Sequence, residues 1–166
     1  MKLIIHDGNP RKIREIFPED GDTVYVEDNH TIQNCVGCFG CWIKTPGKCV
    51  LNDRYNNMGP LIGKADKLIL VSECWYGGYS PFVKAVLERS IPYMHPFFIV
   101  KNNEMHHKDR YNNRFSLKVL FYGENVTEAE KETAEKLVRA NAVNFSCSDA
   151  DVKFFKNLEE LGGDCR

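Results

Sequence analysis

The sequence predicts one α/β domain, residues 1–166, built on a parallel, doubly wound sheet. Three short apolar runs, at residues 3–6, 67–72 and 117–122, are typical of buried strands. Helical patterns lie between these runs, and strands that alternate with helices favour a parallel sheet covered on both faces. A chain of 166 residues can bury one core, and no repeat or linker divides it.

The first strand is expected at Leu3–His6, where the apolar run ends in the turn Asp7-Gly8-Asn9-Pro10. Residues 11–17 are predicted to form one or two helical turns, and 23–27 a second strand by their β-branched and aromatic content. Only about fifteen residues separate the two strands, which is short for a full crossover. We therefore expect a shortened first crossover helix.

Residues 29–52 are expected to form an irregular loop, and residues 53–65 a helix interrupted at Gly59-Pro60. The unbroken apolar run at 67–72 is the clearest strand and is predicted to be central. Ser80-Pro81 begins the next helix as an N-cap followed by proline.

A strand at 117–122 and a helix at 128–142 are expected next, the helix opened by a capping box from Thr127 to Glu130. A short last strand is predicted near residues 144–147. The stretch 92–114 is predicted to be irregular, and loops of that length are more often functional or interface-forming than idle.

Charge and cysteine content narrow the class of protein. The net charge is −1 and basic residues are scattered, so nucleic acid and anionic membranes are not expected partners. The N-terminal apolar run is too short for a signal peptide, and no segment approaches a membrane span. Seven cysteines then predict reduced thiols and a cytoplasmic protein.

Ligands of open α/β sheets bind at the carboxyl ends of the strands. The segments Gly8–Arg11, Glu73–Gly78 and Gly123–Asn125 fall at such ends. In the second, Trp75 and Tyr76 precede paired glycines, so a flat aromatic face adjoins backbone that can approach a planar ring closely. The alternative is that the two aromatic side chains merely cap the core.

Three segments carry a family resemblance: GNPRK after the first strand, CVGCFGCWIKTPGKC, and LILVSECWYGGYSPFVKAVLERS. Together they resemble the flavodoxin-like NADPH-dependent FMN reductase family, and most of all its cysteine-bearing branch, which includes the iron–sulfur flavoproteins. The resemblance covers residues 1–90 best. It implies a flavodoxin-like three-layer sandwich with strand order 2-1-3-4-5, and usually a dimer or other homo-oligomer.

The resemblance also implies a cofactor, FMN, and electron transfer between a nicotinamide nucleotide, NAD(P)H, and an unidentified acceptor. Two sets of residues would bind the cofactor. The phosphate would lie on Gly8, Asn9, Pro10, Arg11 and Lys12, and the flavin ring against Glu73, Cys74, Trp75, Tyr76, Gly77 and Gly78.

The chain departs from the family at both places. Asn9 stands where the family usually has serine, and no serine or threonine follows between Arg11 and Gly21. Glu73 replaces a common proline and brings a negative charge. These departures support an alternative: a degenerate flavodoxin-like scaffold without cofactor that binds a partner protein or zinc.

The cysteine run is the densest chemistry in the sequence. Cys35, Cys38, Cys41 and Cys49 have the spacing C-x2-C-x2-C-x7-C. Four thiolates in a compact, glycine-bearing loop suit a [4Fe–4S] cluster, whereas zinc prefers two more widely separated C-x2-C pairs. Cluster, zinc and plain reduced thiols all stay open, as does a dithiol cycle of the CxxC pairs.

Other polar residues are expected to be structural. Adjacent His106 and His107 point in different directions, which favours solvated or interface histidines over a metal site. Lys84 and the pair Glu88-Arg89 are expected to form surface or dimer salt bridges. No catalytic acid or base is assigned. The leading hypothesis is an FMN-dependent oxidoreductase or electron-transfer protein.

Overall fold

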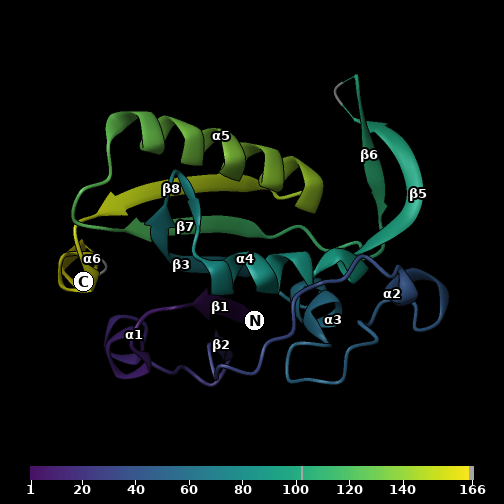
Figure 1. The fold of residues 1–166 in the computed structure, drawn as a ribbon, viewed down its shortest axis with the longest axis horizontal. Coiled ribbons are helices and arrows are strands. Elements are labelled where there is room, and N and C mark those ends of the chain that lie inside the picture. Colours follow the sequence, from purple (N-terminus) through teal and green to yellow (C-terminus); the bar gives the residue numbers. More distant parts are fainter. Residues whose placement is uncertain (102, 165–166) are drawn as a thin grey trace.

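The fold is a three-layer α/β sandwich (Figure 1). The computed structural model describes residues 1–101 and 103–164, so Cys165 lies outside the described residues. Five parallel strands have the order β2-β1-β3-β7-β8, which in chain order is the predicted 2-1-3-4-5. The strands are β1 (Lys2–His6), β2 (Thr23–Glu27), β3 (Lys67–Trp75), β7 (Ser116–Tyr122) and β8 (Asp149–Phe155). The predicted fold class is confirmed.

Helices cover both faces of this sheet. One face packs against α1 (Pro10–Ile16) and α6 (Leu158–Asp164), around Ile4, Ile13, Ile69 and Leu161. The other face carries a larger core, to which α3 (Met58–Gly63), α4 (Pro81–Glu88) and α5 (Glu128–Phe145) contribute. The first crossover helix, α1, has only seven residues, as its short connection predicts.

The helix starts follow the predicted capping chemistry. Ser80 Oγ accepts from the Val83 backbone N–H at 3.4 Å, with Pro81 at the first helical position. Thr127 Oγ1 accepts from the Glu130 N–H at 3.3 Å, and Glu130 Oε2 accepts from the Thr127 N–H at 2.9 Å, which completes a capping box.

The prediction that residues 92–114 are irregular is wrong. After a 3-10 turn, η1 (Ile91–Tyr93), the chain forms an antiparallel hairpin of β5 (Met94–Lys101) and β6 (Glu104–Asp109). Figure 1 shows this hairpin projecting beside the end of α5. His107 on β6 joins the hairpin to Trp42 of the cysteine-bearing segment, since its ring packs against Trp42 and against Phe98 of β5 at centroid distances of 4.9 and 4.8 Å.

The predicted last strand at residues 144–147 is also wrong. Helix α5 continues through Phe145 and ends at Ser146, whose φ of 55° is left-handed. The last strand, β8, begins only at Asp149, and its polar start hides it in the sequence. The strand expected at 67–72 is confirmed and is longer than expected: β3 runs on to Trp75 and pairs there with β4 (Gly78–Tyr79).

Among the described residues no helix is long and apolar enough to cross a membrane. The six cysteines in the described part of the chain are free thiols.

Candidate redox site

The four cysteines of the run line one cavity of about 340 Å³. They lie on the connection between β2 and α3, which includes the single-turn helix α2 (Gly40–Ile43). Cys41 is buried, Cys49 is half-buried, and Cys35 and Cys38 are exposed. The cavity therefore has a protected inner wall and an outer wall open to solvent.

Glycines allow the tight path of this loop. Gly37 has a φ of +64°, in the left-handed region that glycine adopts without strain. A side chain at Gly40 would collide with Val50, because a Cβ there would lie 2.6 Å from Val50 Cγ1. Trp42 joins α2 to the start of β5, since its Nε1–H donates to the Met94 carbonyl at 3.0 Å.

Arg89, the residue that ends α4, forms part of the cavity wall. Its side chain is fully buried, and its Nε–H donates to Cys49 Sγ at 3.1 Å. Both terminal nitrogens contact the Asp53 carboxylate, at 2.7 and 2.9 Å. The expectation of a surface salt bridge is wrong for Arg89, whereas Lys84 and Glu88 do form an exposed pair on α4.

The electrostatics of the cavity set its inner thiol apart. Burial raises the pKa of the Cys41 thiol, and the nearby charges of Cys49, Cys35 and Cys38 raise it further.

Within the described residues no three His, Cys, Asp or Glu side chains form a group that could hold a metal ion. The four cysteines nevertheless line the same cavity.

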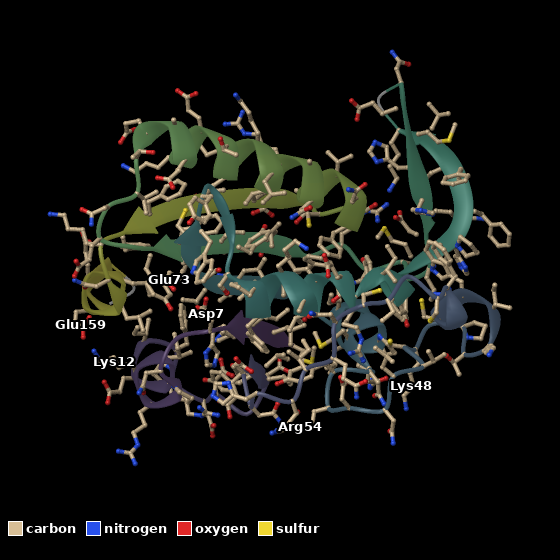
Figure 2. All side chains as sticks on the ribbon, in the orientation of Figure 1. Asp7, Lys12, Lys48, Arg54, Glu73 and Glu159 are labelled. Carbon is tan, nitrogen blue, oxygen red and sulfur yellow. The ribbon has the colours of Figure 1, made fainter. Side chains whose placement is uncertain are left out.

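The second candidate region lies at the carboxyl edge of the sheet, where β1, β3 and β7 end together. The Asp7 carboxylate accepts from the Glu73 backbone N–H at 3.0 and 3.3 Å and from the Tyr122 hydroxyl at 3.0 Å. Burial raises the pKa of Asp7, only partly offset by its hydrogen bonds. Figure 2 shows Asp7 and Glu73 near each other at this edge.

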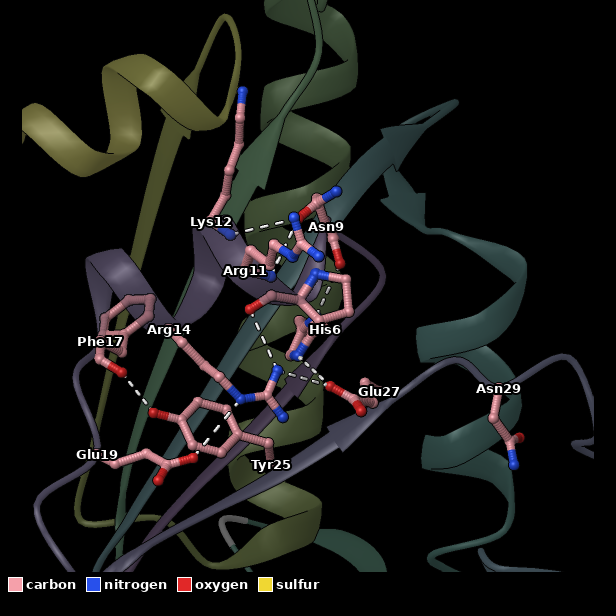
Figure 3. Close-up of polar contacts among 12 residues, drawn as sticks. His6, Asn9, Arg11, Lys12, Arg14, Phe17, Glu19, Tyr25, Glu27 and Asn29 are labelled. Carbon is pink, nitrogen blue, oxygen red and sulfur yellow. Dashed lines mark hydrogen bonds and ion pairs between the residues drawn. The ribbon is translucent and has the colours of Figure 1, made fainter.

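Residues 8–12 comprise the turn after β1 and the first turn of α1, which the Asn9 side chain caps (Figure 3). Asn9 Oδ1 accepts from the N–H groups of Arg11 and Lys12 at 3.0 and 3.4 Å. The Lys12 ammonium is paired with Glu159 on α6. Among the described residues the Arg11 guanidinium has no hydrogen-bond partner, so it is the free cation of this loop.

The loop after β3 is a tight hairpin turn. Tyr76 and Gly77 both have positive φ, 51° and 77°, and a Cβ on Gly77 would lie 2.8 Å from the Glu130 carbonyl on α5. Trp75 and Tyr76 are 46% and 89% exposed, so they do not cap the core. A cavity of about 490 Å³ extends from this turn between α4 and α5 to Glu88, which also lines the cysteine cavity.

The structure thus joins some predicted site residues and separates others. The loop after β1 meets the end of β3 through the hydrogen bond from Glu73 to Asp7. Figure 1 shows α1 and the cysteine-bearing α2 at opposite ends of the molecule. The sequence does not mark Arg89 or Asp53 as a site residue, because thirty-six positions separate them and only the fold brings them together.

No family model matches this chain. Curated relatives match it at low identity. It is 31% identical over 104 residues to an iron–sulfur flavoprotein of Methanocaldococcus jannaschii, covering 55% of this chain and 53% of that protein. It is 27% identical over 115 residues to an iron–sulfur flavoprotein of Methanosarcina thermophila, covering 61% and 59%. The matched part of the chain thus spans little more than half the length of these relatives.

Solved structures show the same fold. An NAD(P)H:quinone oxidoreductase from Methanothermobacter marburgensis superposes with a TM-score of 0.63 at 15% identity, over 100% of this chain and 95% of that one. An azoreductase of Bacillus anthracis superposes with a TM-score of 0.61 at 12% identity, covering 99% and 98%. These matches confirm the flavodoxin-like fold, and the curated relatives confirm the resemblance to iron–sulfur flavoproteins.

Proposed function

We propose that this protein is a redox protein of the iron–sulfur flavoprotein type, whose cysteines at 35, 38, 41 and 49 hold a [4Fe–4S] cluster. The observation that carries the proposal is the shared cavity, which all four cysteines line beside a buried arginine. Cys41 and Cys49 would hold the inner side of the cluster, and Cys35 and Cys38 the side open to solvent. A cluster partly exposed in this way can exchange electrons with a partner at the surface.

The second part of the proposal is FMN at the carboxyl edge of the sheet, with NAD(P)H as reductant. The fold and the names of the relatives support it, and one solved structure with this fold, an NADH-azoreductase, is a complex with FMN. When bound, FMN would supply the chemistry of hydride and single-electron transfer. The exposed faces of Trp75 and Tyr76 suit its planar ring.

The phosphate half of the flavin site fits less well. Asn9 occupies the two N–H groups that would meet a phosphate, Glu159 holds Lys12, and Asp7 and Glu73 add carboxyl groups at the same edge. Arg11 would then hold the phosphate by charge and hydrogen bonding. If so, Arg11→Ala should weaken FMN binding about tenfold or more, the loss expected for one charged hydrogen bond.

These observations at the phosphate half of the site also support the alternative, a scaffold without cofactor. One experiment separates this scaffold from the proposed flavin and cluster protein. The purified protein is incubated with FMN and with iron and sulfide under anaerobic conditions, and its visible spectrum is recorded. Flavin bands together with a brown shoulder that dithionite bleaches support the full proposal. A protein that binds neither favours the scaffold, and Cys38→Ser should remove the shoulder but not the flavin bands.

We also propose a homo-oligomer in the cytoplasm. Free thiols suit a reducing compartment. Among the described residues, seven large apolar side chains on α2 with its flanking loop and on the β5–β6 hairpin are more than half exposed: Val36, Phe39, Ile43, Phe97, Phe98, Val100 and Met105. Ring contacts of Trp42 with Phe39 and of His107 with Trp42 and Phe98 make the two segments one surface. Light scattering should then give a multiple of 19.1 kDa, and a monomer would reject this part.

A further inference from the structure

We infer that Arg89 is the positioning residue of the four-cysteine site: it clamps both ends of the cysteine loop and donates a hydrogen bond to the sulfur of Cys49. The inference rests on the proposed cluster for its effect on redox chemistry. The clamp itself is a property of the polypeptide and can be tested without any cluster.

The clamp is visible in the contacts of the guanidinium. Arg89 Nη1 donates to the Gln33 carbonyl at 2.7 Å, two residues before the first cysteine of the run. Nη2 donates to the Leu51 carbonyl at 3.4 Å, two residues after Cys49. One side chain at the end of α4 therefore ties together the two ends of the segment that carries all four thiols.

Asp53 fixes the direction of the guanidinium. Its carboxylate accepts hydrogen bonds from both terminal nitrogens of Arg89. It also accepts hydrogen bonds from the backbone N–H groups of Gln33 and Tyr55, at 3.1 and 3.0 Å. Asp53 and Arg89 side chains are 5% and 0% exposed, so water does not compete for these contacts. Asp53 holds the two terminal nitrogens of the planar guanidinium, and the remaining Nε–H group points toward Cys49.

A hydrogen bond to a ligand sulfur has a defined consequence. It stabilises the reduced, more negative state of an iron–sulfur cluster and so raises the reduction potential. The buried positive charge of Arg89 acts in the same direction. We therefore assign Arg89 the role of holding the cluster potential above the value that the four thiolates alone would set.

The decisive variant is Arg89→Lys. Lysine keeps the charge and can still reach Asp53, but a methylene group replaces Nε, so the donor to Cys49 is lost. The matched control is Arg139→Lys, the same exchange at an exposed position on α5 that pairs with Glu135. Iron and sulfide content, the reduction potential from a dye-coupled titration, and the far-ultraviolet circular dichroism are measured for both variants and for the wild type.

The expected result is a more negative potential in Arg89→Lys, with unchanged iron and sulfide content and an unchanged potential in Arg139→Lys. If Arg89→Lys binds the cluster and has the wild-type reduction potential, the hydrogen bond from Arg89 to Cys49 does not set the potential. The proposed function would not be affected by that result. A wild-type protein that takes up no iron and sulfide overturns the proposed function, and the effect on the potential with it.

The clamp has its own readout in the metal-free protein. Arg89→Met should speed amide hydrogen exchange across residues 33–53 by about tenfold or more relative to the wild type, with β3 and β7 unchanged. If Arg89→Met does not fold, Arg89→Lys should show a smaller increase confined to the same segment. Wild-type exchange rates over residues 33–53 in a folded variant would refute the clamp.

Discussion

Removing Asp53 should expose how strongly the cysteine loop depends on its buried ion pair. In Asp53→Ala the guanidinium of Arg89 stays buried but loses its charged partner. Breaking such a pair typically costs ~3–5 kcal/mol. The carbonyls of Gln33 and Leu51 still accept from Arg89, so we expect the lower end, a loss of ~3 kcal/mol in the free energy of unfolding.

The assay is urea denaturation followed by circular dichroism at neutral pH, with the slope checked for constancy. Glu88→Ala provides the control, because it breaks the exposed Lys84–Glu88 pair on the same helix and should cost less than ~0.5 kcal/mol. A loss below ~1 kcal/mol for Asp53→Ala would refute the reasoning, since it would mean that the guanidinium reaches water once its partner is gone.

The pH dependence follows from the same contacts. Burial alone would raise the pKa of Asp53, but hydrogen bonds from Arg89, Gln33 and Tyr55 outweigh it and lower the pKa below the ordinary 3.8. A lowered carboxyl pKa stabilises the fold above 3.8, and the contribution is lost as the pH falls through the folded pKa. The stability gap between wild type and Asp53→Ala should therefore narrow only in that acidic range.

Two further results are expected. Burial raises the pKa of Asp7, so ionising this carboxyl group destabilises the fold above its folded pKa but has no effect below the ordinary value of 3.8. Asp7→Asn should therefore raise the urea midpoint at pH 7 and lose this advantage at low pH. An unchanged midpoint at pH 7 would argue against a buried carboxylate. In the folded metal-free protein, maleimide should label exposed Cys35 and Cys38 before Cys41 and before Cys147, whose thiol pKa burial raises to about 12; mass spectrometry after timed quenching follows the order, and early labelling of Cys147 would contradict it.

The sequence predicts the frame of the domain well because local signals agree with the global fold there. The runs Leu3–His6 and 117–122 and the capping box at Thr127 are each complete within a few residues. The features that were missed depend on distant partners. β8 begins with polar residues, and the β5–β6 hairpin is held by the packing of His107 against Trp42.

The same division applies to the candidate site. The spacing of the cysteines predicts that they lie together, and they do share one cavity. Nothing local to Arg89 indicates that it is buried, because its partners Asp53 and Cys49 come from another part of the chain. In the segment after β1, where the resemblance implies a phosphate site, the sequence shows the missing hydroxyl groups, but only the structure shows that Asn9 caps α1 there.

The most direct test of the central claim is the iron and acid-labile sulfide content of the anaerobically reconstituted protein, measured beside Cys38→Ser. A cluster bound by Cys35, Cys38, Cys41 and Cys49 predicts about four iron and four sulfide per wild-type chain, and a clear loss of both in the variant. A folded wild-type protein that retains neither would contradict the proposal that this cavity holds a cluster.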